Sequence, residues 1–94
     1  DVPRYAFTLA FYQQQKGDLT GATGVLDGLI AKYPAYADAY VLLGGIYEKQ
    51  GKKAEAEGVY NKGLAVEGMP DQYKVRMKGR LEALKGAPPD TQKK

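Results

Sequence analysis

The stretch ADAYVLLGGIYEKQGKKAEAEGVYNKGLAVEGMP, residues 37–70, decides the fold of this chain. Gly51 divides it into two patterns in which apolar and small residues recur at steps of three and four. Such spacing places one apolar stripe on each of two helices. Glycine takes the left-handed conformation that often ends a helix at little cost, so Gly51 suits the junction. We therefore expect a helical hairpin with helices over 37–50 and 53–67. Its stripes are Tyr40, Leu43, Gly44 and Tyr47, then Ala56, Val59, Tyr60, Gly63 and Leu64.

Three further helices are predicted around this hairpin, which makes the fold class all-α. The first covers 3–16, with Pro3 in its first turn, where a missing amide hydrogen costs nothing. The second covers 19–33, with Asp18 as its N-cap, and the last covers 71–85 after Pro70. We expect a disordered tail over 86–94. The predicted core residues are Tyr5, Ala6, Leu9, Ala10 and Tyr12 in the first helix, Ala22, Val25, Leu26, Leu29 and Ile30 in the second, and Tyr73, Met77, Leu81 and Leu84 in the last.

Glycines inside the second predicted helix need an explanation, because each costs roughly 1 kcal/mol relative to alanine. Gly24 and Gly28 lie four residues apart, as in the dimer motifs of membrane helices. No run of about 18 apolar residues surrounds them. We therefore expect close packing against a neighbouring helix, or a helix that needs its neighbours in order to form.

The chain repeats itself at a shift of 34 residues. Leu9 aligns with Leu43 and Gly17 with Gly51. The other matching pairs lie in the second helix of each unit: Ala22 with Ala56, Gly24 with Gly58, Val25 with Val59, Ile30 with Leu64, and Ala31 with Ala65. Matches of small and apolar residues at these positions are expected where a hairpin packs on its own repeat.

This period and pattern resemble the tetratricopeptide repeat. In residues 37–70 the resemblance is carried by a large residue, Leu-Gly, an aromatic, a turn glycine, Ala, an aromatic and a small residue. These are Tyr40, Leu43, Gly44, Tyr47, Gly51, Ala56, Tyr60 and Gly63. The usual closing proline would fall at Gly68, and Pro70 follows two residues later. Residues 3–36 resemble the repeat less closely, since Ala6 and Gln13 replace a bulky residue and a tyrosine.

The resemblance implies a segment of right-handed α-solenoid with four parts. These are a degenerate repeat over 3–36, a second repeat over 37–70, a capping helix over 71–85 and the tail over 86–94. Repeat arrays usually need about three units, because each unit buries its face only against neighbours. We therefore expect support from a homo-oligomer, a larger complex, or residues that this chain lacks.

The residues absent from the sequence argue against catalysis. It contains no Cys, His, Ser or Trp, so the common nucleophile–base pairs cannot form. Metal sites built on Cys or His are excluded in the same way, and no acidic stretch has calcium-loop spacing. We expect no enzyme activity, no metal and no cofactor.

A partner-binding groove is implied by the resemblance, since the first helix of each repeat in this family lines a concave surface. Phe7 and Phe11 would be apolar anchors beside a floor at Gly45, which suits an apolar helix or extended peptide. The alternative is that both Phe residues pack on an absent helix. By register, the groove positions are Arg4, Phe7, Phe11, Gln14, Gln15, Asp38, Val41, Gly45, Glu48 and Lys49, followed by Gln72, Val75, Arg76 and Gly79.

A carboxylate clamp for the C-terminal tails of chaperones is one known use of such grooves, and it requires Lys and Asn at set positions. Phe7, Phe11, Leu42 and Gln72 occupy four of those positions here, and only Arg76 agrees with the requirement. We therefore do not expect a clamp.

A second candidate surface is basic. Residues 71–94 hold seven Lys and Arg against three Asp and Glu, whereas residues 1–70 hold seven against eight. Lys74, Lys78 and Lys85 fall within about 40° on one helix face, at 100° per residue. This face is either a solvated surface or a docking site for an acidic protein, nucleic acid or membrane surface. No aromatic residues alternate with these charges, so we do not expect nucleic acid.

The sequence thus predicts a non-catalytic protein–protein interaction module, a scaffold or assembly subunit whose groove binds a protein or peptide. The alternatives are an integral subunit buried in a larger complex, and docking through the basic helix over 74–85. No transmembrane segment is expected, and the protein should be soluble. The chain begins with Asp1 rather than Met, so we expect processing or truncation, which leaves an exported, periplasmic location open.

Overall fold

A computed structural model describes residues 2–86 of the chain. Within that range the backbone forms five helices and no strand: α1 (Val2–Gln15), α2 (Leu19–Lys32), α3 (Ala37–Lys49), α4 (Lys53–Leu64) and α5 (Asp71–Gly86). The all-α prediction is confirmed, and each predicted helix is present. Helix α4 ends three residues before its predicted end at 67. The tail predicted over 86–94 falls outside the described residues, except for Gly86, which belongs to α5.

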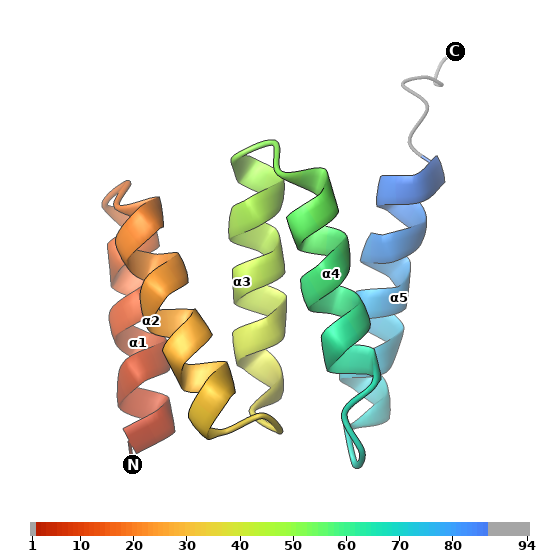
Figure 1. The fold of residues 1–94 in the computed structure, drawn as a ribbon, viewed down its shortest axis with the longest axis horizontal. Coiled ribbons are helices and arrows are strands. Elements are labelled where there is room, and N and C mark those ends of the chain that lie inside the picture. The colour runs from red at the N-terminus through yellow and green to blue at the C-terminus, as the bar shows by residue number, and fades with distance from the viewer. Residues whose placement is uncertain (1, 87–94) are drawn as a thin grey trace.

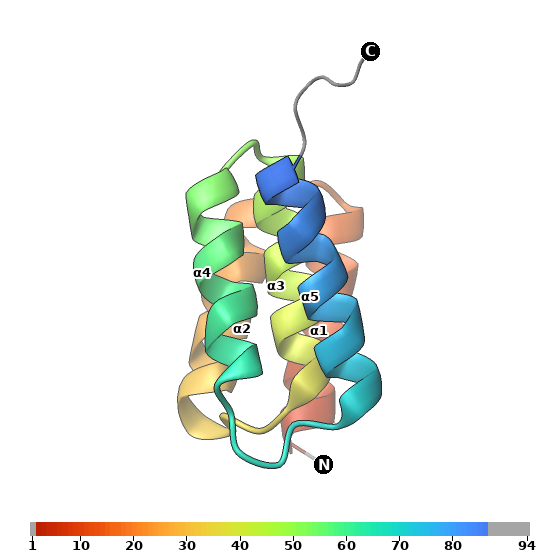
Figure 2. The same ribbon diagram turned by 90° about the vertical axis from the view of Figure 1, so that its right-hand side faces the viewer.

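The five helices stack in two layers. Helices α1, α3 and α5 form one layer, and α2 and α4 form the other (Figures 1 and 2). Each helix packs against the next along the chain, and α3 also contacts α1 and α5 within its own layer. Helix α3 is therefore central to the described structure, and the α1–α3–α5 layer presents side chains from three helices on one surface.

Glycine residues with positive φ angles form three of the connections between helices. Gly17 has φ of 92° and Gly51 has φ of 75°, as expected for turns that follow a helix. Gly68, with φ of 83°, lies between α4 and α5 and is followed by the buried Met69. The predicted cap of α2 is confirmed, because an Asp18 carboxylate oxygen accepts a hydrogen bond from the Gly21 amide at 3.0 Å.

The core forms where the predicted stripes of α2, α3, α4 and α5 meet, and two glycines allow its closest contacts. A Cβ atom added to Gly44 would lie 2.4 Å from the ring of Tyr60, and one added to Gly63 would lie 2.6 Å from the sulfur of Met77. Tyr40 is completely buried, and its hydroxyl donates a hydrogen bond to the Pro34 carbonyl at 2.5 Å. Gly44 therefore lets α3 and α4 pack closely within the hairpin over 37–70, and Gly63 lets α5 pack closely on α4.

The predicted core stripe of α1 is wrong in three positions. Tyr5, Leu9 and Tyr12 are exposed, whereas Ala10 is buried and Ala6 is partly buried. Helix α1 turns its small residues toward α2, which allows the two helices to approach closely, and this orientation points the large residues away from the core.

Close packing at Gly24 and Gly28 is also contradicted. Both residues are exposed, and a Cβ atom added to either one would meet no atom within 4 Å. Within residues 2–86, therefore, no neighbouring helix uses their small size.

Candidate partner-binding groove

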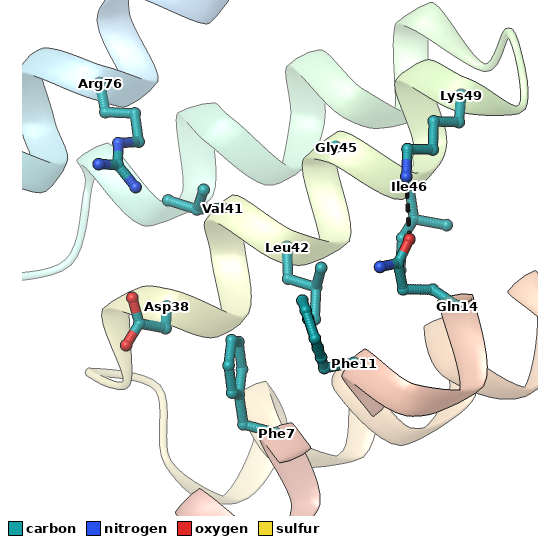
Figure 3. A pocket seen from close by; sticks show the side chains of 10 residues that line it. All are labelled: Phe7, Phe11, Gln14, Asp38, Val41, Leu42, Gly45, Ile46, Lys49 and Arg76. Atoms are coloured by element: carbon teal, nitrogen blue, oxygen red, sulfur yellow. Dashed lines mark hydrogen bonds between the residues drawn. The ribbon is translucent and has the colours of Figure 1, made fainter. Parts of the chain in front are cut away.

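A hollow of about 250 Å³ lies on the layer formed by α1, α3 and α5. Helices α1 and α3 supply its two walls, and α5 contributes Arg76 at one end (Figure 3). Its lining consists of Phe7, Phe11, Gln14, Asp38, Val41, Leu42, Gly45, Ile46, Lys49 and Arg76. We call this hollow, together with the one described below, the groove.

Two phenylalanines form the α1 wall, and their surroundings differ. Phe7 is partly buried against the core, and its ring lies 6.0 Å from that of Tyr36 in a tilted arrangement. Phe11 is 38% exposed, and its ring meets Tyr12 edge-on at 6.2 Å. Both side chains point toward α3 (Figure 3). Phe11 therefore presents more ring surface to the hollow, whereas Phe7 also supports the fold.

The facing wall is the exposed side of α3. Val41 and Leu42 are half-buried there, and Ile46 is buried. A Cβ atom added to Gly45 would meet nothing within 4 Å. Space inside the core does not require glycine at this position, and the missing side chain leaves the floor of the groove open.

Polar side chains connect the three helices at the ends of this hollow. The Lys49 ammonium donates a hydrogen bond to the Gln14 side-chain oxygen at 3.0 Å, which joins α3 to α1. At the other end the Tyr73 hydroxyl donates to an Asp38 carboxylate oxygen at 2.7 Å, which joins α5 to α3. The pKa of Tyr73 is raised, first because its neutral form donates this bond and then because it is partly removed from water.

A second, more open hollow of about 450 Å³ continues toward α5. It shares Val41, Gly45, Lys49 and Arg76 with the first, so the two make one continuous surface. Glu48, Tyr60 and Arg80 complete its lining.

Glu48 is the centre of a hydrogen-bonded group in this second hollow. Its Oε2 accepts bonds from the Tyr60 hydroxyl at 2.5 Å and from Arg80 Nε at 3.1 Å, and a second guanidinium nitrogen contacts Oε1. The Arg80 bonds lower the pKa of Glu48, burial opposes them, and the Tyr60 bond adds to the lowering. Burial raises the pKa of Tyr60, and its bond to Glu48 raises it further. The Glu48 charge is thus compensated within the protein.

Most of the groove positions expected from the sequence lie together. Nine of them line the groove: Phe7, Phe11, Gln14, Asp38, Val41, Gly45, Lys49 and Arg76 in the first hollow, with Glu48 in the second. Arg4, Gln15, Gln72, Val75 and Gly79 are exposed and line neither hollow. Leu42, Ile46, Tyr60 and Arg80 also line it, although they were not among those positions. Ile46 and Tyr60 have the character of core residues, and the 34-residue shift aligns Arg80 with Ile46, so no sequence pattern pairs Arg80 with Glu48.

The predicted basic face lies elsewhere on α5. Lys74 is half-buried, Lys78 and Lys85 are exposed, and none of the three lines the groove. Among residues 2–86 no group of His, Cys, Asp and Glu side chains could hold a metal ion. No helix in the same range is long and apolar enough to cross a membrane.

The fold defines a helical-repeat protein with a groove on the layer formed by α1, α3 and α5. A family model described as tetratricopeptide repeat matches residues 14–81, which is well over half of the chain. The chain belongs to the tetratricopeptide repeat family, and the resemblance noted in its sequence is confirmed. Repeats of this family generally mediate protein–protein interaction and are typically non-catalytic. No curated protein and no solved structure matched the chain.

Proposed function

We propose that this protein is a non-catalytic scaffold or assembly subunit that binds an apolar helix or extended peptide of a partner protein in the groove. The observation that carries the proposal is the partly exposed ring of Phe11, which lines the same hollow as the open floor at Gly45. Aromatic side chains that lie in a hollow and lose contact with water when a partner binds are typical of the few interface residues that dominate binding energy.

The proposed mechanism is shape complementarity on a rigid surface. The α1 and α3 walls are joined by the Lys49–Gln14 hydrogen bond, and α3 and α5 by the bonds at Asp38 and Glu48. A surface that is already ordered loses little conformational entropy when a partner binds. Burial of apolar side chains against Phe11, Val41 and Leu42 supplies the favourable free energy.

The charges around the groove favour one chemistry of partner. Arg80 compensates Glu48, and Asp38 offsets one of the two positive charges that Lys49 and Arg76 bring to the first hollow, so the lining of the groove keeps an excess of one positive charge. A partner with apolar residues on one face and a carboxylate beside them fits this arrangement, because rim charges set orientation and association rate more than affinity.

Selection of peptides from a displayed random library against the purified chain tests this proposal. Selected peptides should carry apolar residues at helical or alternating spacing. Their affinity should fall at least about tenfold for Phe11→Ala, as for an anchor residue. Tyr5→Ala is the matched control, because it removes an exposed aromatic from the same helix outside the groove. Peptides that bind wild type and Phe11→Ala equally would refute the groove.

A further inference from the structure

Helix α1 carries a second apolar surface that the groove does not use. Val2, Tyr5, Leu9 and Tyr12 are 63%, 72%, 41% and 58% exposed, and we call them the outer stripe. At 100° per residue they fall within about 80° of one another. Phe7 lies about 180° and Phe11 about 140° from the centre of this stripe on the same helix. The two apolar surfaces of α1 therefore point in opposite directions.

The repeat register shows what kind of surface the outer stripe is. A shift of 34 residues carries its four positions onto Tyr36, Ala39, Leu43 and Ile46. Ala39, Leu43 and Ile46 are buried and Tyr36 is partly buried, at the start and along the length of α3, which packs against α1 and α2. The outer stripe therefore corresponds to positions that are buried in the second repeat. In the first repeat none of residues 2–86 covers these positions.

The residue types on the stripe favour a separate chain over another tightly packed hairpin. Tyr5 stands where α3 has Ala39, and Tyr12 stands where it has Ile46. Large side chains at these positions prevent the close approach that Ala39 permits. Tyrosine combines a broad apolar ring with a hydroxyl that tolerates water, and it is enriched at interfaces between proteins.

The spacing of these residues suits pairing with a second copy of the same chain. Their separations are three, four and three, so the spacing of the stripe, although not the order of its residue types, is the same in both directions along the helix. We propose that two copies of this chain pair through the outer stripe, with their α1 helices antiparallel about a two-fold axis near the level of residue 7. Val2 of each copy then lies opposite Tyr12 of the other, and Tyr5 lies opposite Leu9. Self-complementary contacts of this kind define an isologous dimer.

A hollow beside the stripe receives one of these side chains. It measures about 220 Å³ and lies between α1 and α2, with Val2, Ala6, Val25, Gly28 and Tyr33 in its lining. A cavity of about 150 Å³ can hold benzene, so this one has room for an aromatic ring. Antiparallel pairing brings Tyr12 of the second copy to Val2, at the edge of this hollow. Gly28, whose small size no helix within residues 2–86 uses, keeps the space open.

Helix α5, at the opposite end of residues 2–86, lacks a surface that matches the outer stripe. Val75 is the exposed large hydrophobic residue within the described part of α5, and exposed charges such as Lys78 and Glu82 accompany it. Head-to-tail stacking would place an apolar stripe on this charged helix. Pairing of stripe with stripe avoids that mismatch and gives a closed dimer rather than an open filament.

The area available suits a weak, reversible dimer. At about 200 Å² per aromatic side chain, Tyr5 and Tyr12 expose roughly 260 Å² in each copy. Two copies would remove roughly 500 Å² of tyrosine surface from water, about a third of a standard interface of about 1,600 Å². Val2, Leu9, Tyr33 and the exposed backbone around Gly24 and Gly28 add to it. Because the groove faces the opposite way, the dimer would hold two open grooves, and this proposal does not depend on what they bind.

Sedimentation equilibrium of the full 94-residue chain, from about 1 μM to about 1 mM, tests the association. We expect a monomer–dimer equilibrium whose dissociation constant rises at least about tenfold in Leu9→Asp, since each dimer contains two copies of the change. Val75→Asp, at an exposed apolar position on α5 away from the stripe, should leave it unchanged. Circular dichroism establishes that both variants stay helical. A chain that is monomeric throughout, or whose association depends on Val75 and not on Leu9, would overturn the proposal.

Cysteine cross-linking tests the antiparallel arrangement, and the absence of native Cys makes each introduced thiol unique. Val2→Cys and Tyr12→Cys variants that differ in mass are mixed and oxidised. The mixed disulfide should form in preference to either homodimeric disulfide, and Val75→Cys should form little of any. Predominant Val2–Val2 and Tyr12–Tyr12 disulfides would instead indicate parallel pairing and would refute the two-fold arrangement. A Val75→Cys disulfide that forms as readily as the mixed Val2–Tyr12 disulfide would also refute the arrangement.

Discussion

Glu48 on α3 is bound by Arg80 on α5 through two guanidinium nitrogens, with Nε 3.1 Å from Oε2. The two residues are 32 positions apart, and their contact connects the central helix to the last helix across the second hollow. Helix α5 therefore depends on a polar contact in addition to the apolar contacts of Met77 and Leu81, and this contact also shapes the surface proposed to bind a partner.

Replacement of Arg80 should loosen the docking of α5. Arg80→Ala should lower the free energy of unfolding by about 1 kcal/mol, a modest value because about half of the Arg80 side chain is in water. Arg80→Lys should recover only part of the loss, since an ammonium cannot make both contacts. Urea denaturation measures both values. Lys78→Ala, an exposed change on the same helix, is the control and should alter stability by less than about 0.5 kcal/mol.

The contact between Glu48 and Arg80 also makes the stability of the protein depend on pH. The pKa of Glu48 is lowered in the folded protein, so the stability from its ionised form is complete above its ordinary value of 4.5. That stability is lost as the pH falls below 4.5 and through the lowered folded value. Wild type should therefore lose stability over this range more steeply than Glu48→Gln, which cannot ionise. Thermal unfolding midpoints measured between pH 6 and pH 2 (roughly the span of carboxylate titration) provide the comparison. Parallel curves for the two proteins would contradict the role of Glu48.

Two adjacent glycines of α3 should respond in opposite ways to alanine. Gly44→Ala places a Cβ atom 2.4 Å from the Tyr60 ring, which burial and the Glu48 hydrogen bond hold in place. The resulting overpacking should cost about 1–3 kcal/mol. Gly45→Ala meets open space and should stabilise α3 by up to about 1 kcal/mol. Because the new methyl group enters the groove, it should also weaken peptide binding. Chemical denaturation and titration calorimetry on the pair separate packing from binding.

The sequence was sufficient for the α2, α4 and α5 stripes because the apolar residues of each of these helices lie mainly on one side. Helix periodicity reveals such a side directly, and the turn glycines at Gly17 and Gly51 mark where the helices end. In α3 the predicted stripe also faces the core, but Ala39 and Ile46, which lie outside that stripe, are buried as well. The break after Leu64 was predicted three residues late, since Ala65 and Val66 continue the apolar pattern and only the turn at Gly68 fixes the exit of the chain.

Helix α1 could not be oriented in this way because it is apolar on more than one side. Tyr5, Leu9 and Tyr12 lie on one side, Phe7 and Phe11 on another, and periodicity cannot tell which of them the fold covers. The structure buries neither set fully and instead turns Ala6 and Ala10 to α2. Nine of the positions given by the register line the two hollows, but the hydrogen bonds at Glu48 depend on distances between helices that no local pattern contains.

The two phenylalanines of the groove should separate folding from binding. Phe7 is partly buried and packs near Tyr36, so Phe7→Ala should lower both the free energy of unfolding, by about 2 kcal/mol, and peptide affinity. Phe11 is more exposed, so Phe11→Ala should cost less than about 1 kcal/mol of stability and yet reduce affinity at least tenfold. Urea denaturation and calorimetric titration with a selected peptide measure the two effects, and Phe11→Leu, which keeps an apolar side chain, should restore part of the binding. Equal stability losses for Phe7→Ala and Phe11→Ala would instead indicate that both residues belong to the core. The groove would then have to be sought among Val41, Leu42 and Gly45 alone.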